Sequence, residues 1–250
     1  MKGRPLIFIT GGSRGIGRAI AFAGARLGYD IAFTYRSGKA EADELLRQLM
    51  ALGGDAMAVR ADGASQEETR RAFAEVEARF GRLDGLVANA GIVGEPRSIL
   101  DVDEEHLSAV LRINVLGTFF AIGEAARRMS TQRGGSGGAI VVMSSAAARH
   151  GGMVKEAHYA ASKGAMDSMT LALAKELPDH GIRINALRPG VIRTAIHDVH
   201  GGEQTIAAVE PAIPLKRAGV PEEVAEAAMF LLGDASSYIH GAIIDISGGR

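Results

Sequence analysis

The 250-residue sequence contains no cysteine, no polybasic run and no excess of charge of either sign. The absence of cysteine excludes disulfides, thiolate metal sites and a cysteine nucleophile. Lys and Arg number 28 against 29 Asp and Glu, so nothing points to nucleic acid or an anionic membrane surface. No apolar run approaches the length of a membrane span, and the first residues lack a signal-peptide pattern, so we expect a cytoplasmic protein.

Short apolar runs alternate with longer segments of helix-forming composition along the chain. The apolar runs predict strands at 6–10, 31–35, 56–60, 85–88, 140–143, 183–187 and 242–246. The segments between them predict helices at 16–27, 40–52, 66–80, 104–129, 159–177 and 222–232. This order predicts an α/β fold: a single Rossmann-like, doubly wound domain over residues 1–250, with a seven-stranded parallel sheet and helices on both faces.

Two connecting stretches are unusual in composition. The glycine-rich stretch at 134–138 has an ordinary loop length and runs into a strand, so we interpret it as a helix-to-strand turn. The segment at about 195–215 is long for a connection and is either a mobile lid over the site or a structural excursion. It carries His197 and His200, but no third ligand is placed nearby, so we expect no metal site.

The first predicted strand runs into a loop of small residues, Thr10-Gly11-Gly12-Ser13-Arg14-Gly15-Ile16-Gly17, and then into a helix. A phosphate-binding turn needs this order, because small residues let the backbone approach a pyrophosphate and the helix N-terminus supplies N–H donors. The spacing departs from G-x-G-x-x-G, and glycines also serve plain turns. Its place at the first βα turn favours a dinucleotide site.

The end of the second strand carries the signal for cofactor choice. An acidic side chain there would bind the ribose 2′-hydroxyl of NAD, but this chain has Tyr35-Arg36-Ser37. Arg36 and Arg14 are placed to hold a 2′-phosphate, so we predict that NADP(H) is preferred and that NAD(H) is possible. The alternative is that both arginines are solvated surface residues.

Polar and small side chains also follow the third and fourth strands. Asp62 is placed to accept a hydrogen bond from an adenine amino group, or else it is a turn or cap residue. Asn89-Ala90-Gly91 puts small residues where the backbone would meet a ribose.

Tyr159 and Lys163 lie four residues apart in a predicted helix, which places them one turn apart on one face. An ammonium group near a phenol lowers the phenol pKa, so Tyr159 would exchange a proton with a substrate oxygen near neutral pH. An aromatic anchor beside a solvated lysine is the alternative for the pair alone. Ser144-Ser145 follows the fifth strand and lies at the same carboxyl edge of the sheet, where ligands bind in open α/β folds.

The motifs together resemble the short-chain dehydrogenase/reductase family over essentially the whole chain. The matching positions are Thr10-Gly11-x-x-x-Gly15-x-Gly17, Asp62, Asn89-Ala90-Gly91, Asn114, Ser145, Tyr159-x-x-x-Lys163, Pro189-Gly190 with Thr194, and Gly248-Gly249. The resemblance implies cofactor contacts at Gly11, Ser13, Arg14, Gly15, Ile16, Gly17, Arg36, Asp62, Gly63, Asn89, Ala90, Gly91, Tyr159, Lys163, Pro189, Gly190, Ile192 and Thr194.

The resemblance also implies catalytic roles. Tyr159 would be the general acid in carbonyl reduction and the base in alcohol oxidation, and Lys163 would lower its pKa and hold the ribose hydroxyls. Ser145 would polarise the substrate carbonyl. Asn114 would bind a water that links Lys163 to solvent. One residue more than usual between Ser145 and Tyr159 leaves open whether Ser144 or Ser145 faces the substrate, and we expect Ser145 because the second serine usually has this role in the family.

The predicted reaction is hydride transfer between nicotinamide and a small-molecule carbonyl or alcohol. The sequence most resembles 3-oxoacyl-[acyl carrier protein] reductases and glucose 1-dehydrogenases, and the family implies a homotetramer. A catalytically silent dinucleotide-binding sensor or scaffold is the alternative, but it would need none of the proton-transfer residues. A nucleotide-sugar epimerase would need a longer region after Pro189-Gly190.

Overall fold

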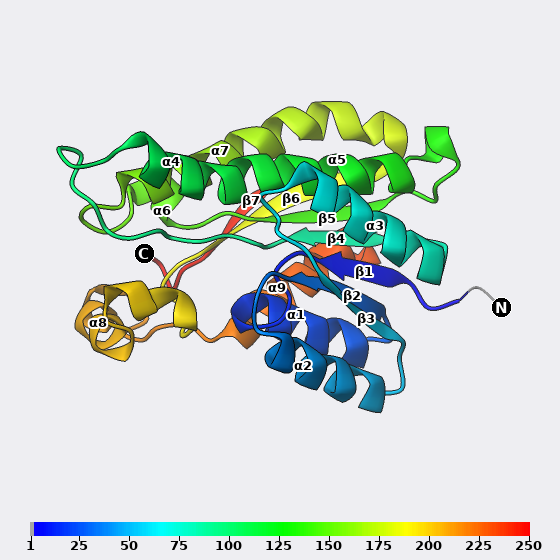
Figure 1. Ribbon diagram of the computed structural model, residues 1–250, viewed down its shortest axis with the longest axis horizontal. Coiled ribbons are helices and arrows are strands. Elements are labelled where there is room, and N and C mark those ends of the chain that lie inside the picture. The colour runs from blue at the N-terminus through cyan, green and yellow to red at the C-terminus, as the bar shows by residue number, and fades with distance from the viewer. Residues whose placement is uncertain (1–2) are drawn as a thin grey trace.

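The computed structural model describes residues 3–250, apart from the side chains at positions 197 and 200. Seven strands form one parallel sheet in the order β3-β2-β1-β4-β5-β6-β7, which confirms the predicted fold (Figure 1). The strands are β1 (Leu6–Ile9), β2 (Asp30–Tyr35), β3 (Ala56–Arg60), β4 (Gly85–Ala88), β5 (Gly138–Met143), β6 (Ile182–Pro189) and β7 (Ile243–Ile246).

Helices cover both faces of this sheet. They are α1 (Gly15–Arg26), α2 (Lys39–Ala51), α3 (Gln66–Phe80), α4 (Glu104–Leu111), α5 (Gly117–Met129), α6 (Ala147–His150), α7 (Ala157–Glu176), α8 (Glu203–Val209) and α9 (Pro221–Leu232). Because all strands are parallel, the loops that follow them meet at one edge. In Figure 1 this is the edge where α6, α8 and the C-terminus lie.

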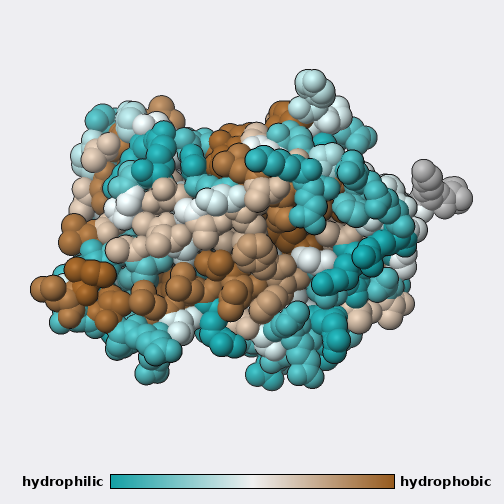
Figure 2. All heavy atoms as spheres, turned by 90° about the horizontal axis from the view of Figure 1, so that it is seen from above, coloured by the Kyte–Doolittle hydropathy of each residue, from teal (hydrophilic) through white to brown (hydrophobic). Residues whose placement is uncertain are grey.

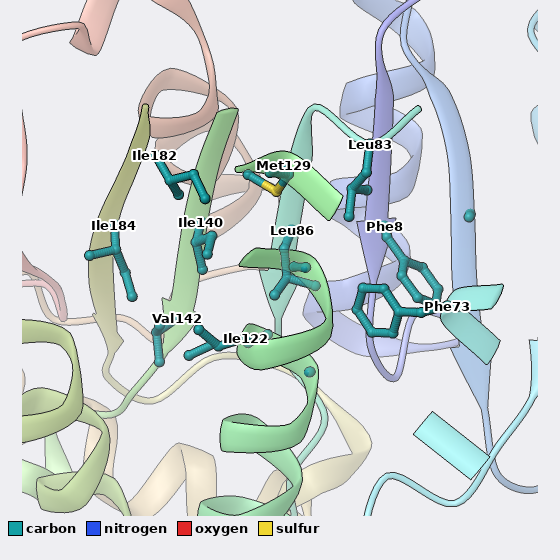
Figure 3. Packing of buried hydrophobic residues seen from close by; sticks show 14 of the residues in the cluster. Phe8, Phe73, Leu83, Leu86, Ile122, Met129, Ile140, Val142, Ile182 and Ile184 are labelled. Atoms are coloured by element: carbon teal, nitrogen blue, oxygen red, sulfur yellow. The ribbon is translucent and has the colours of Figure 1, made fainter. Parts of the chain in front are cut away.

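The strands bury apolar side chains on both faces, because successive residues of a strand point to opposite sides. Ile7 and Ile9 of β1 pack with residues of α1, α2 and α9, whereas Leu6 and Phe8 pack with residues of α3, α5 and α7. Phe8 meets Phe73 of α3 edge to face, with ring centroids 4.5 Å apart (Figure 3). The two cores hold the sheet rigid, so the loops at its carboxyl edge have fixed positions.

The helix predicted at 104–129 is interrupted. Between α4 and α5 the chain forms a π-helical turn, Arg112–Leu116, which contains Asn114. Gly117 follows directly, and a Cβ on it would lie 2.5 Å from the carbonyl oxygen of Gly63. The prediction of one regular helix was therefore wrong, because the i, i+4 sequence pattern does not register the extra residue that a π turn accommodates.

The same helical stretch, Glu104–Met129, is long and apolar enough to cross a membrane by length and composition alone, contrary to our reading of its sequence. In the most apolar part of this stretch 44% is buried, as expected for a helix that packs against strands on one side only. Its inner face contacts β4, β5 and α3. Figure 2 shows that hydrophobic residues gather in a band on the outer face of the layer that contains α4, α5 and α7.

Two short helices were not predicted. The first is α6, directly after Ser144-Ser145, and the second is α8, within the 195–215 segment. Two 3₁₀ turns, Ala195–His200 and Glu210–Ala212, flank α8. Arg193 forms ion pairs with Glu203 of α8 and with Glu210, the latter at 2.5 Å, and so connects the segment to the end of β6.

Candidate active site

A cleft of about 130 Å³ lies at the carboxyl edge of the sheet. It brings together ten of the predicted site residues from three strand ends, α1 and α7: Ile16, Asn89, Gly91, Ser145, Tyr159, Lys163, Pro189, Gly190, Ile192 and Thr194. Gly63 and Ala90 instead line a small neighbouring cavity of about 20 Å³ under α5. The remaining predicted residues lie on the loops that follow β1, β2 and β3, at the start of α1, or in the turn between α4 and α5: Gly11, Ser13, Arg14, Gly15, Gly17, Arg36, Asp62 and Asn114.

The glycine loop after β1 is held from the neighbouring strand. The Asn89 side-chain amide donates to the carbonyl oxygens of Thr10 and Gly11 at 3.0 and 2.9 Å. In return the Thr10 hydroxyl accepts from the backbone N–H groups of Asn89 and Ala90, both at 3.0 Å. A Cβ at Gly17 would lie 2.5 Å from the Gly11 carbonyl oxygen, so glycine is required there.

The backbone of the loop has the features of a phosphate-binding turn. Gly11 and Gly15 have φ of 65° and 55°, the left-handed region that favours glycine. Arg14 lies at the N-cap of α1 without a side-chain cap bond, so the first N–H groups of this helix point outward. Small residues, a helix N-terminus and a cleft that continues to Tyr159 fit the shape of a dinucleotide.

Arg14 and Arg36 both expose their guanidinium groups at this edge. Within residues 3–250, neither side chain has a protein hydrogen-bond or ion-pair partner, although the Arg36 carbonyl oxygen accepts from Arg60 at 3.4 Å. Two arginines without protein acceptors are available for an anion, as a 2′-phosphate would require.

Asp62 has the turn role that was the alternative for it, and its contact with an adenine stays a prediction. Its carboxylate accepts from the backbone N–H of Ala64 at 3.0 Å, and its own N–H donates to Glu68 at 2.9 Å. The carboxylate therefore shapes the turn after β3. A Cβ on the following Gly63 would lie 3.0 Å from the end of the Ile113 side chain, so a larger residue here would require Ile113 to shift.

Lys163 is buried, with 6% of its surface exposed, and its ammonium group donates to the carbonyl oxygen of Met143 at 2.8 Å. Burial lowers the pKa of Lys163 to about 8, and the negative charge of Asp167 opposes this shift. The ammonium group lies 5.8 Å from the centre of the Tyr159 ring. The pair predicted from its spacing is therefore present on one face of α7.

The pKa of Tyr159 is opposite to our prediction. Burial raises it to about 12, a hydrogen bond with Ser145 lowers it in part, and the charge of Glu156 raises it further. The physical reason is that burial withdraws the phenol from water, and this raises the pKa by more than the hydrogen bond with Ser145 lowers it. In this structure Tyr159 therefore keeps its proton at neutral pH.

The two serines after β5 have different surroundings. The Ser144 hydroxyl donates to Asp167 at 2.7 Å and also lies 3.1 Å from the Lys163 carbonyl oxygen, on the α7 side. The Ser145 hydroxyl accepts from the Ala147 backbone N–H at 3.1 Å and bonds with Tyr159. Asp167 in turn pairs with Arg188 at 2.7 Å, so Ser144 belongs to a polar network that supports Lys163.

Asn114, 1% exposed, holds the loop after β4. Its side chain accepts from the Ile92 N–H at 2.9 Å and donates to the Ile92 carbonyl oxygen at 2.8 Å and to Ser162 at 2.9 Å. A Cβ on Gly91 would lie 3.0 Å from Asn114 Oδ1 and 3.4 Å from Lys163 Nζ. Asn114 thus fixes a glycine backbone next to Lys163.

The segment after β6 forms the opposite wall of the cleft. Gly190 lies so close to Ser247 that a Cβ would be 2.8 Å from the Ser247 Cα atom. Ile192 is 4% exposed and pairs with Gly219 in an isolated bridge. Thr194 lies 3.4 Å from the position of a Cβ on Gly15, so this wall reaches across to the glycine loop.

Ser144, the alternative to Ser145, and Ile196 of the 195–215 segment also line the cleft. The cleft residues that were not predicted from the sequence are Val93, Met143, Ala146, Ala147, His150, Gly152, Met153, Glu156, Val191 and Arg250. Glu156 is the N-cap of α7 and lies outside the helix predicted at 159–177. Most of the others come from loops or from the unpredicted helix α6, where spacing gives no direction.

The side chains of His197 and His200 lie outside the described residues, and so does the metal pair considered for them. Elsewhere in the described part of the chain, no three or more His, Asp or Glu residues are grouped in a way that would hold a metal ion.

A parallel sheet with a glycine loop, buried Lys163 and Tyr159 in one cleft defines an NAD(P)-dependent oxidoreductase. The chain belongs to the short-chain dehydrogenase/reductase family. A family profile described as Enoyl-(Acyl carrier protein) reductase matches residues 11–250. A crystal structure of a short-chain type dehydrogenase/reductase from Mycobacterium marinum is similar with a TM-score of 0.92 and 34% identity, over 99% of this chain and 95% of that one.

Characterised and uncharacterised relatives are similar over nearly their full length. "Uncharacterized oxidoreductase YgfF" of Escherichia coli is 40% identical over 98% of this chain and 99% of its own. "3-oxoacyl-[acyl-carrier-protein] reductase FabG" of Staphylococcus aureus is 34% identical over 100% and 99%. "Glucose and ribitol dehydrogenase homolog" of Oryza sativa is 36% identical over 96% and 84%.

Proposed function

We propose that this protein is an NADP(H)-dependent oxidoreductase in which Tyr159 transfers the proton that accompanies hydride transfer to or from a carbonyl or alcohol. The observation that carries the proposal is the meeting of a phenol, a hydroxyl and an ammonium group in one cleft that continues to the glycine loop. The nicotinamide cofactor, when bound, supplies or accepts the hydride.

The remaining roles follow from the contacts of each residue. Ser145 bonds with Tyr159 and so is placed to polarise the same substrate oxygen, whereas the Ser144 hydroxyl is engaged with Asp167. Buried Lys163 is held by Met143 at the base of the cleft, where it would bind the ribose and favour the Tyr159 phenolate. Asn114 positions the Gly91 backbone beside Lys163. A water bound at the carbonyl oxygen of Asn114 would link Lys163 to solvent for proton transfer.

The first test is Tyr159→Phe, which removes only the proton donor. We expect kcat to fall by about 10²–10⁴-fold, the usual contribution of general acid catalysis, with little change in NADPH affinity. Steady-state kinetics with a carbonyl substrate and a fluorescence titration with NADPH measure the two effects. Turnover at the wild-type rate would contradict the proposed role.

The second test is Arg36→Asp, which tests cofactor choice. A carboxylate here would repel the 2′-phosphate and accept a hydrogen bond from the 2′-hydroxyl of NADH. We expect the NADPH/NADH ratio of kcat/KM to fall by about tenfold or more, a change of about 1.4 kcal/mol. Arg26→Ala, on an exposed arginine at the far end of α1, is the control and should leave the ratio unchanged.

The alternative, a catalytically silent dinucleotide sensor, is not favoured by the structure. A pure binder has no use for a buried lysine directed at a tyrosine and a serine within one cleft. A screen of NADPH oxidation over ketones, aldehydes, sugars and acyl thioesters separates the two functions and identifies the substrate. The relatives named for 3-oxoacyl carrier-protein reduction and for glucose and ribitol oxidation set the first compounds to test.

We further propose a homotetramer in the cytoplasm. The support is the band of hydrophobic residues over α4, α5 and α7, in which Leu116 and Phe119 are 43% and 50% exposed (Figure 2). Packing between subunits would cover this band, and it would also account for the apolar character of the Glu104–Met129 stretch without a membrane. The 195–215 segment, which contributes Ile196 to the cleft, is proposed to act as the substrate lid.

A further inference from the structure

A second concave surface lies on the other side of the molecule from the glycine loop. It is a groove of about 700 Å³ between α3 and α5 that extends to the start of β4 and to the glycine-rich turn before β5. Its volume is within the range of about 300–1,000 Å³ that is usual for small-molecule sites. None of the residues predicted for the cofactor or the reaction lines it.

Five arginines line this groove, in a chain whose net charge is −1. Three of them have carboxylate partners: Arg82 pairs with Asp84, and Arg127 and Arg128 share Glu124 at 2.7 and 2.6 Å. One carboxylate therefore serves two guanidinium groups, and Glu77, 3.0 Å from Arg128, is the only other acidic residue in the lining.

The other two arginines, Arg70 on α3 and Arg133 after α5, are exposed. Among the described residues neither has a side-chain hydrogen bond or ion pair. The groove thus contains two guanidinium groups free to bind an anion, next to three that are paired with Asp84, Glu124 and Glu77. Guanidinium groups bind phosphate oxygens in a bidentate manner, so this surplus favours a phosphate over a singly charged group.

The glycine-rich turn completes the polar side of the groove. The N–H groups of Gly135 and Gly137 donate to the carbonyl oxygens of Ser130 and Met129, at 2.9 and 2.7 Å. Within the described part of the chain, the N–H and hydroxyl groups of Ser136, between these glycines, donate to no protein acceptor. A Cβ on Gly135 would lie 2.3 Å from the Arg128 carbonyl oxygen, so glycine is needed to bring this donor to the groove.

The inner wall of the groove is apolar. Phe73, Val76 and Leu83 are part of the lining although each is buried to more than nine-tenths. The Arg128 guanidinium lies 5.5 Å from the centre of the Phe73 ring. The charge of Arg128 is therefore held where the polar side of the groove meets its apolar wall. A ligand with phosphate groups and a flat or apolar body would match both.

We propose that this groove binds a small phosphate-bearing molecule, with Arg70, Arg133 and Ser136 as its phosphate contacts. The shared chemistry is a pair of adjacent phosphates, which occurs both in inorganic pyrophosphate and in nucleoside diphosphates. The site lies apart from the cleft of Tyr159, so its occupation does not depend on the function proposed above.

Isothermal titration calorimetry tests the proposal, with pyrophosphate and ADP as probes. The protein is first saturated with NADP⁺, so that the cofactor cleft cannot accept either probe. We expect one equivalent of probe per chain, with affinity that falls as salt is added. Tighter binding of ADP would identify a nucleotide as the ligand, and equal affinities would identify the phosphates alone.

The deciding variant is Arg70→Ala/Arg133→Ala, which should weaken binding at least about tenfold, as expected for the loss of two charge-assisted contacts. Both side chains are exposed and unpartnered within the described chain, so folding should be unaffected. Arg26→Ala/Arg47→Ala, which removes the same charge from α1 and α2, is the control. Absence of a second site in the wild type, or equal weakening in both double variants, would overturn the proposal.

Discussion

Burial controls the chemistry of the two central side chains. It raises the pKa of Tyr159 to about 12 and lowers that of Lys163 to about 8, so both are driven toward their neutral forms. The unfolded chain binds the Lys163 proton more tightly than the folded chain does. This residue therefore opposes folding below about pH 8, and less so as the pH rises from there toward the ordinary lysine value.

The pH dependence of reduction follows from these shifts. Below about pH 8 Lys163 is charged and Tyr159 holds its proton, so we expect kcat/KM to be constant there. Above it kcat/KM should fall as Lys163 loses its charge, while Tyr159 remains protonated. Initial rates with NADPH from about pH 6 to about pH 10 measure this dependence. Lys163→Met should remove the fall in kcat/KM above about pH 8, together with most of the activity. A profile that is level to pH 10 would contradict the assignment.

The sequence identified these residues but could not give their protonation. A spacing of four residues in a helix is a local property, so Tyr159 and Lys163 were predicted correctly to share a face. The direction of a pKa shift depends on how much water the rest of the fold removes, and no local pattern contains that quantity. His150 and Arg250, which reach the cleft from the unpredicted helix α6 and from the stretch after β7, had no such local signal.

At the scale of elements, the π-helical turn Arg112–Leu116 places Asn114. It allows α5 to approach the turn after β3 so closely that Gly117 meets the Gly63 carbonyl oxygen. The strands were predicted to within two residues at each end, because buried parallel strands are continuous apolar runs. The π turn was not predicted, because it leaves the apolar periodicity of the flanking helices nearly unchanged.

Gly117→Ala tests this close approach. The new methyl group would lie 2.5 Å from a backbone atom, so the helix or the turn must move, and we expect a loss of about 1–3 kcal/mol in the free energy of unfolding. NADPH affinity should weaken as well, because Gly63 moves with the turn. Urea denaturation and a cofactor titration measure the two effects.

Gly123→Ala in the same helix is the matched control. Apart from the helix's own backbone, the nearest atom to a Cβ there would be the flexible end of the Arg127 side chain, 3.6 Å away, so alanine fits. We expect it to stabilise the protein by up to about 1 kcal/mol through its higher helix propensity. Equal effects of the two substitutions would show that helix propensity, not contact with Gly63, determines the result.

At the scale of the whole molecule, the outer face of α4, α5 and α7 remains apolar after the chain has folded (Figure 2). Leu111, Leu116, Phe119 and Leu171 are each between 37% and 50% exposed. The apolar residues of these helices can be read in the sequence, but the sequence does not separate the side that meets the sheet from the side left open. Only the packed structure makes that division.

Leu116→Lys/Phe119→Lys should therefore dissociate the proposed tetramer. Two charges placed in an apolar contact would have to be desolvated without partners, which is strongly unfavourable. Size-exclusion chromatography with light scattering measures the mass. Leu27→Lys/Met50→Lys, at side chains exposed by 64% and 53% on the other face of the sheet, is the control and should leave the assembly intact. A wild-type monomer would contradict the proposed assembly.

The hydrogen bonds between Asn89 and the first βα turn are made entirely by groups of the protein. A nicotinamide nucleotide that serves as a reagent has to arrive and depart in every catalytic cycle. Since the turn is ordered by the protein's own amide groups, loading does not have to arrange it, and departure does not let it collapse. Exchange of the oxidised and reduced nucleotide is then limited by the contacts that the nucleotide itself makes. The rigid edge of the sheet keeps the same binding site through every cycle.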